Sequence, residues 1–243
     1  MHRNLSPIRG SLMIAAAVIG LGLAGCGSDG GGGASNNPAS TPGAGTTPGA
    51  GAGQIQGATF ASATSRQLWS GLTLPSTRTM KNRPEPTEPE FTSTVSYSAD
   101  TQRGIDCVKI EEENEATVWM AKDTQGRVVI IQIDEDGVLE QPATIDDTQY
   151  IPTQGVAVGQ SWITDSATKH NTWQVMSINA TAPRNGTTGC TLLRITTSYN
   201  TPETSDDDTW YIWWSNAKGV VEEAESDTVG PDQMYHYESN PAS

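Results

Sequence analysis

From about residue 90 to the C-terminus, short runs of Thr, Val, Ile, Trp and Tyr are separated by Gly, Asp, Asn and Pro. No long stretch places apolar residues at the i, i+3, i+4 and i+7 positions that form one face of a helix. Trp173 and Val175 instead follow each other at the two-residue period of a strand. The pattern predicts an all-β domain, with strands at about 91–98, 105–111, 116–122, 127–133, 160–165, 171–180, 190–199, 208–215, 219–225 and 233–238.

The segment from 57 to 83 has no clear period. Its stretch "RQLWSGLTLPS" fits a short helix that leads into an extended segment, and it fits equally a packed arm. Pro and Glu then alternate from Pro84 to Glu90, which predicts an extended and solvated connection.

Two parts of the β-rich region resemble each other. "GIDCVKI" and "VWMAKDTQGRVV" in 104–129 match "GCTLLRI" and "YIWWSNAKGVVE" in 189–222, glycine on glycine. In each copy Asp or Asn opens a turn that a Gly completes in the left-handed conformation, as in a hairpin with a G1 bulge. The pattern favours two related β units joined side by side, and chance similarity is the alternative.

The N-terminus has the features of an export signal. Residues 1–11 carry Arg3 and Arg9 without an acidic residue, and Leu12–Ala24 is an unbroken apolar run of 13 residues. Such a run is shorter than the ~20 residues that a membrane-spanning helix needs. Residues 1–25 are therefore predicted to be a signal peptide rather than a permanent anchor.

The end of this run, "LAGC", resembles the lipobox of bacterial lipoproteins. The resemblance implies that the Cys26 thiol carries diacylglycerol and that the chain is cut before it. Gly27, rather than Asp, follows the cysteine, which resembles lipoproteins sent to the outer membrane when the host is Gram-negative. The expected location is thus the cell envelope, with the membrane contacted through the N-terminal lipid. An ordinary signal peptide that happens to contain a cysteine is the alternative.

Residues 26–56 consist largely of Gly, Ser, Thr, Pro, Ala and Asn and offer little apolar bulk to bury. Such a composition predicts a disordered linker, and thirty such residues span about 30 Å on average. The remaining chain, 57–243, is long enough for one β-rich domain with a single core.

The chain is acidic, with 28 Asp and Glu against 14 Lys and Arg. The signal peptide contains two of the basic residues and no acidic one, so the mature chain has a net charge near −16. Repulsion from phosphate argues against nucleic acid and anionic lipid headgroups as partners. A solvated acidic surface is the simplest interpretation.

The motifs "VAVGQSW", "TAPRNGTTGCTLLRI" and "YIWWSNAKGVVEEAE" resemble, in this order, a group of uncharacterised all-β bacterial lipoproteins. The resemblance covers about 155–225 and, more loosely, 104–129. It implies a strongly curved antiparallel sheet, similar to the open half-barrel of lipoprotein carriers. The aromatic strand is followed by Gly219 and two valines without a second glycine, which departs from that pattern. The resemblance implies no catalytic residue.

Cysteine usage follows from export. With Cys26 assigned to lipid, Cys107 and Cys190 remain. An oxidising compartment predicts a disulfide between them, and two buried thiols are the alternative.

Catalytic motifs are missing from the sequence. After the signal peptide only His170 and His236 remain as histidines, and a surface or structural role is expected for both. No G-x-S-x-G elbow, cofactor-binding motif or histidine pair at metal-ligand spacing is present. Asp206 and Asp208, in an acidic loop, are weak candidates for cation binding, so no metal and no cofactor are predicted.

Aromatic residues are the remaining feature. The strand expected at 208–215 carries large rings on both faces, since alternate side chains point in opposite directions. If one face lines a concave sheet, it offers an apolar surface for a ligand. The candidate contact residues are Trp173, Trp213 and Trp214. Alternatively, both faces are core or are covered by an N-terminal arm around Trp69.

Three function classes follow. The first is a non-catalytic envelope lipoprotein that binds an unknown protein or acts as a scaffold, which the lack of a catalytic constellation favours. The second is a carrier or binder of a hydrophobic ligand, which requires a real cavity. The third is an envelope hydrolase with a site around a carboxylate or His170.

Overall fold

The structure, a computed structural model, describes residues 55–112, 115–135, 137–165, 169–199, 208–230 and 233–239. This part of the chain is all-β and contains no helix. Its strands are β1 (Ser76–Arg83), β2 (Phe91–Gln102), β3 (Ile105–Glu112), β4 (Thr117–Lys122), β5 (Arg127–Glu135), β6 (Val138–Glu140), β7 (Tyr150–Pro152), β8 (Ser161–Asp165), β9 (Lys169–Ala180), β10 (Cys190–Tyr199), β11 (Asp208–Ser215), β12 (Gly219–Ala224) and β13 (Tyr235–Glu238).

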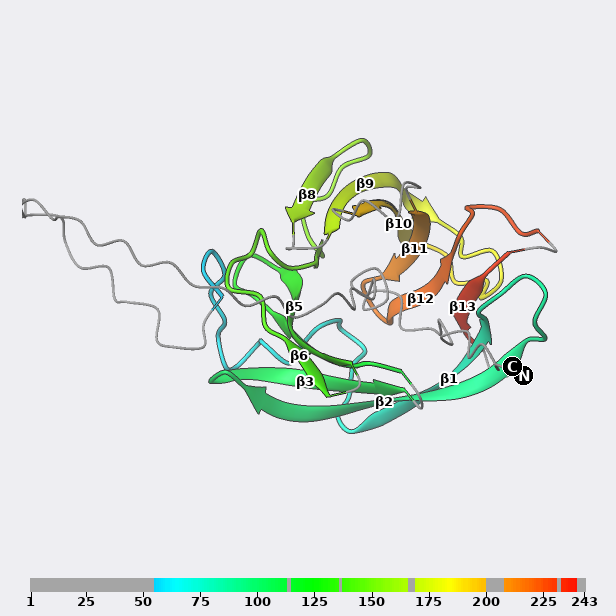
Figure 1. The fold of residues 1–243 in the computed structure, drawn as a ribbon. Coiled ribbons are helices and arrows are strands. Elements are labelled where there is room, and N and C mark those ends of the chain that lie inside the picture. The colour runs from blue at the N-terminus through cyan, green and yellow to red at the C-terminus, as the bar shows by residue number, and fades with distance from the viewer. Residues whose placement is uncertain are drawn as a thin grey trace, which may run out of the picture.

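All strands belong to one antiparallel sheet, in the order β6-β5-β4-β3-β2-β1-β13-β12-β11-β10-β9-β8, with β7 beside β5. The sheet does not close, so β6 and β8 are its two ends. Figure 1 shows that it curls round, bringing β8 and β9 opposite β5. The predicted curved, open antiparallel sheet is therefore confirmed.

In the sheet, strands β1 to β6 lie side by side in the order of the sequence, and so do strands β8 to β13. The two series meet where β1 pairs with β13. The β4–β5 pairing shifts register between Trp119 and Met120, and the β11–β12 pairing shifts between Trp213 and Trp214. Each hairpin also contains a glycine with positive φ, at Gly126 (φ 78°) and Gly219 (φ 79°). Both halves thus use a glycine turn followed by a bulge, a combination that increases local twist and bends a sheet.

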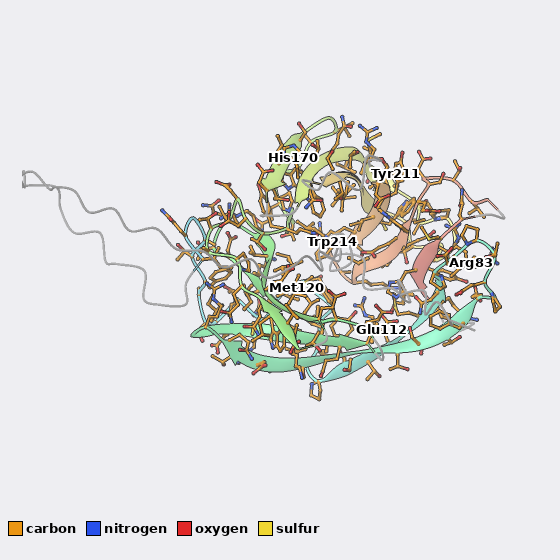
Figure 2. The ribbon with its side chains drawn as sticks, viewed as in Figure 1. Arg83, Glu112, Met120, His170, Tyr211 and Trp214 are labelled. Atoms are coloured by element: carbon orange, nitrogen blue, oxygen red, sulfur yellow. The ribbon has the colours of Figure 1, made fainter. Side chains whose placement is uncertain are left out.

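The concave side of the sheet is a continuous apolar core. Alternate residues of each strand point inward, so β4 contributes Met120 and β11 contributes Trp214 (Figure 2). The buried members of this core are Leu68, Trp69, Met80, Val95, Tyr97, Val108, Ile110, Val118, Met120, Val128, Ile130, Ile133, Ile151, Trp173, Val175, Leu193, Ile195, Ile212 and Trp214.

The convex side carries two smaller buried clusters, one on each half. In the first, Ile55 and the half-buried Phe60 pack against Trp119. In the second, Ala182, from the loop between β9 and β10, belongs to the same cluster as Trp213. Both faces of the aromatic strands are therefore covered.

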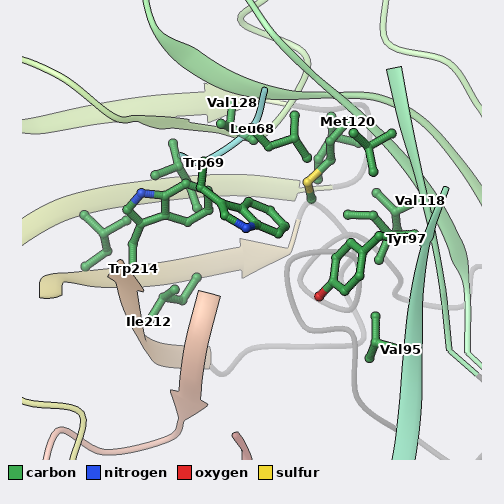
Figure 3. Close-up of a cluster of buried hydrophobic side chains, with 14 of the residues drawn as sticks. Leu68, Trp69, Val95, Tyr97, Val118, Met120, Val128, Ile212 and Trp214 are labelled. Carbon is green, nitrogen blue, oxygen red and sulfur yellow. The ribbon is translucent and has the colours of Figure 1, made fainter. Parts of the chain in front are cut away.

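An N-terminal segment, residues 61–74, closes one end of the curled sheet; we call it the plug. Its Trp69 makes edge-to-face contacts with Tyr97 on β2 (centroids 5.5 Å apart) and Trp214 on β11 (6.1 Å), as Figure 3 shows. Backbone hydrogen bonds tie the plug to both glycine hairpins, from Lys122 to Ser65 and from Ser70 to Asn216. The plug thus joins halves of the sheet that lie far apart in strand order.

The structure contains the predicted strands and three further ones. Strands lie where they were predicted from residue 91 onward, whereas β1, β6 and β7 were not predicted. The signal peptide, Cys26 and nearly all of the linker lie outside the described residues. Within the described ranges, no helix is long and apolar enough to cross a membrane.

Alanine substitutions at two glycines with similar φ can separate the destabilisation caused by backbone strain from that caused by packing. A Cβ at Gly219 would lie 2.6 Å from the Trp69 ring, whereas a Cβ at Gly104 (φ 74°) would meet nothing within 4 Å. Denaturant unfolding should show Gly104→Ala lowering the free energy of unfolding by about 1 kcal/mol, through left-handed strain alone. Gly219→Ala should lower it by about 3 kcal/mol, because the ring must also move. Equal losses would contradict the close packing of the plug.

Candidate functional site

The predicted ligand-contact tryptophans do not line an open surface. Trp173, Trp213 and Trp214 are at most 2% exposed, and Trp213 faces the convex side while the other two face the interior. The interior cavity beside the Trp69 and Trp214 rings has a volume of about 40 Å³. Pockets for small organic ligands usually measure about 300–1,000 Å³. This cavity therefore has room for only a few water-sized groups.

A polar cluster interrupts the apolar interior where the two halves meet. Glu112, at the end of β3, accepts hydrogen bonds from Ser93 Oγ and, at 3.3 Å, from Asn82 Nδ2. His236 of β13 lies across from it, with Nε2 3.7 Å from Glu112 Oε2. Both side chains are at most 3% exposed. This cluster is the candidate functional site because His236 also lines the interior cavity, together with the buried Glu223 of β12.

Burial determines the charges of this site. It raises the pKa of Glu112 to about 7, although the hydrogen bonds from Ser93 and Asn82 oppose the shift. Burial and repulsion from Glu112 and Glu135 raise the pKa of Glu115 to about 8. Burial alone lowers the pKa of His236 to about 3. His236 is consequently neutral at physiological pH, and the carboxyls titrate there.

The geometry does not form a nucleophilic relay. In such a relay the imidazole accepts the proton of the serine and the carboxylate orients the imidazole. Here the Ser93 hydroxyl donates to Glu112 rather than to His236. The arrangement therefore stabilises a buried carboxyl and leaves the serine without a general base.

The other predicted histidine is part of the surface. His170, on β9, contacts its cross-strand partner Asp165 through Nδ1, 2.5 Å from Oδ1. Its side chain is 41% exposed and that of Asp165 is 60% exposed. The pair has the position of an ordinary hairpin contact and does not face the interior cavity.

The predicted disulfide between Cys107 and Cys190 is wrong, because both residues are free and buried. Cys107 lies on β3 in the first convex cluster and Cys190 on β10 in the second. Six inter-strand steps of about 4.8 Å separate these strands around the sheet, whereas a disulfide needs Cα atoms within about 7 Å. Burial raises the pKa of Cys107 to about 11 and also raises that of Cys190, so neither is an activated thiol.

Only one of the two weak metal candidates lies among the described residues. Asp208 is exposed at the start of β11, and Asp206 lies outside the described residues. Among the residues that the structure places, no group of three His, Cys, Asp or Glu side chains is arranged to hold a metal ion.

Sequence reasoning did not identify the polar cluster. A signal was present, because Val108, Ile110 and Glu112 follow the same inward period of β3 and the last of them is charged. Comparison with family models, curated protein sequences and solved structures gives no match for this chain.

Glu112 predicts a pH-dependent stability. Its pKa is about 7 in the folded chain, above the ordinary 4.5, so the folded state binds more protons between these values. The free energy of unfolding contributed by this group therefore falls as pH rises through that window. Glu112→Gln removes the contribution of this group, while Glu115 and His236 keep theirs, and the variant should gain on the wild type across the window, by roughly 3 kcal/mol at its upper end.

Urea unfolding at several pH values tests this. Glu111→Gln is the matched control, because the adjacent Glu111 side chain is 43% exposed and pairs with Lys109. The pH-dependent gain of Glu112→Gln should exceed any change that this control shows. A difference between Glu112→Gln and the wild type that stays constant with pH would show that the pKa of Glu112 in the fold is ordinary.

Proposed function

We propose that this chain is a non-catalytic binding module of the bacterial cell envelope, held at the membrane by a lipid on Cys26. The lipobox resemblance of "LAGC" supports the anchor, and the composition of residues 26–56 suits a tether. For a Gram-negative host, the residue after Cys26 favours the outer membrane.

The position of the exposed apolar side chains carries the proposal. Among the described residues, seven large apolar side chains are exposed. Four of them lie on or beside the two end strands of the sheet: Val138, Leu139, Val158 and Ile163. End strands present unpaired backbone groups, and partner proteins commonly add to them. A contact surface of this kind suits a protein partner better than a small molecule.

The carrier function is the second candidate, supported by the apolar interior. It requires the plug to leave, because Trp69 and Leu68 occupy the space between the two halves. The small interior cavity therefore favours the binding module. A hydrolase is the weakest of the three, since the described part of the chain offers the half-buried Ser93 no general base.

The anchor predicts a specific mass. The mature protein isolated from its membrane should begin at Cys26 and carry acyl chains on that residue. Cys26→Ala should abolish both the cleavage and the acyl mass, whereas Cys107→Ala, a matched cysteine substitution, should leave them unchanged. Intact-mass spectrometry reads both results, and a wild-type chain without acyl mass would contradict the anchor.

The binding surface can be mapped by photo-crosslinking in the cells that produce this protein. A benzophenone side chain placed at Val138 or Val158 should give discrete protein adducts. The same group at Phe91, on the central strand β2, or at Val229, on the β12–β13 connection, should give none, although both side chains are also exposed. Adducts of equal intensity at all four positions, or a lipid-sized mass retained by the purified protein, would overturn the proposal.

A further inference from the structure

The two ends of the curled sheet meet along a seam, which we define as the boundary between β8 and residues 141–150. Two contacts cross it: the Asp165 amide donates to the Asp146 carbonyl at 2.7 Å, and the Tyr150 and Trp162 rings stack at 5.8 Å. Figure 1 shows β8 and β5 at the two sides of this opening. A cavity of about 40 Å³ lies in the seam, and its wall includes Ile130, Ile133, Thr148, Gln149, Thr164 and Asn171.

One polar side chain in this wall lacks a partner. Gln149 is 3% exposed, yet neither its amide nitrogen nor its amide oxygen makes a hydrogen bond. Its neighbours are satisfied: Thr148 donates to the Ile130 carbonyl, and Thr164 accepts from the indole of Trp173. A buried amide without partners costs free energy that native proteins seldom leave uncompensated. Its donor and acceptor together match one peptide group of an incoming chain.

The β8 strand offers a free edge beside this amide. β8 pairs with β9 on one side only, and the Asp165 amide points away from β9 toward the seam. Backbone groups of an antiparallel strand alternate in direction with a period of two. The N–H and C=O of Ile163 therefore also point toward the seam, where no described strand pairs with them. The exposed side chains of Ile163 and Val158 lie at this edge.

The charge of the seam selects the partner. Glu140, Asp147 and Asp165 line the cavity and Asp146 borders it, while no Lys or Arg is among the lining residues. Three basic side chains border the seam: His170 contacts Asp165, Arg103 donates to the Pro142 carbonyl at 2.6 Å, and the Arg127 guanidinium lies 5.3 Å from the Tyr150 ring centroid. An approaching strand with Lys or Arg would meet opposite charge, and the net charge of −14 would attract it from a distance.

We propose that the seam binds an extended peptide segment rich in Lys or Arg, which adds as a strand to the free edge of β8. Its backbone would pair with the N–H and C=O of Ile163, and its basic side chains would lie against the exposed Asp146 and Asp147. Pairing with the Gln149 amide requires the two sides of the seam to separate, because this side chain is 3% exposed and the cavity beside it measures about 40 Å³. This inference rests on the proposed function, because it names the class of segment that the binding module recognises.

A direct test measures binding of fluorescently labelled decapeptides to the full-length mature protein by fluorescence anisotropy. The probe alternates Lys and Thr and has blocked ends. One control peptide replaces Lys by Glu, and a second carries N-methylated backbone amides on its Lys residues, so that it keeps the charge but cannot form a strand pair. The first peptide should bind at least tenfold more tightly than either control.

Three variants locate the site. Asp146→Lys should weaken binding about tenfold, whereas Asp227→Lys, the same charge change on the exposed β12–β13 connection, should change it less than twofold. Gln149→Met keeps the volume and removes the unpartnered amide. It should leave the melting temperature unchanged or raised while weakening binding about fivefold, a combination that a purely structural role for Gln149 would not produce.

The inference is overturned if the Lys peptide does not bind, if the N-methylated peptide binds equally well, or if Asp146→Lys and Asp227→Lys have the same effect. The last result would indicate general charge attraction. Protein adducts at Val138 and Val158 without binding of the Lys peptide would reject the basic strand and leave the binding-module proposal standing. If Val138 and Val158 give no protein adducts and the Lys peptide does not bind, both the basic strand and the binding-module proposal are rejected.

Discussion

The packing of Trp69 between Tyr97 and Trp214 is the interaction on which the rest of the structure depends. An open sheet of 13 strands has no ladder of strand-pairing hydrogen bonds between its two ends, although the Asp165 amide donates to the Asp146 carbonyl across the seam. The indole supplies a contact across the interior, with edge-to-face geometry on both sides. The guanidinium of Arg78 lies 4.8 Å from the Trp69 ring centroid and adds a cation–π contact. Gly219 has no Cβ, which allows the indole to approach the β11–β12 hairpin closely.

This arrangement determines which functions the fold can support. An apolar half-barrel filled by its own N-terminal segment has little volume left for a ligand. The buried Glu112 and His236 lie at the junction of β1 and β13, where they respond to pH and make no catalytic relay. The unpartnered Gln149 amide and four of the seven exposed large apolar side chains of the described residues lie at or beside the ends of the sheet. Recognition of another chain at these ends is therefore the function that the packing favours.

Much of the fold could be predicted from the sequence because it depends on local signals. The two-residue period and the glycine turns at Gly126 and Gly219 locate the central hairpins, and the lack of a helical period excludes a helical domain. A packed arm around Trp69 was one of the alternatives for residues 57–83, and the structure agrees with it. Its contacts and β1 could not be located, since these residues are ordered by strands distant in sequence. The disulfide prediction failed for a related reason: export predicts the redox environment but not the distance between Cys107 and Cys190. Gln149 became a candidate only when the seam placed it beside β8.

Hydrogen–deuterium exchange of the full-length mature protein, read at single amides, tests most directly whether the plug is a permanent part of the interior. The amides of Ser70 and Gly71 donate to the carbonyls of Asn216 and Ala217 and should exchange as slowly as central amides of β3 and β11. Equal protection would mean that the plug opens only when the whole domain unfolds. Exchange of the Ser70 and Gly71 amides within seconds, with β3 and β11 still protected, would contradict this account. The plug would then open while the sheet stays folded, and the interior would be accessible to a hydrophobic ligand.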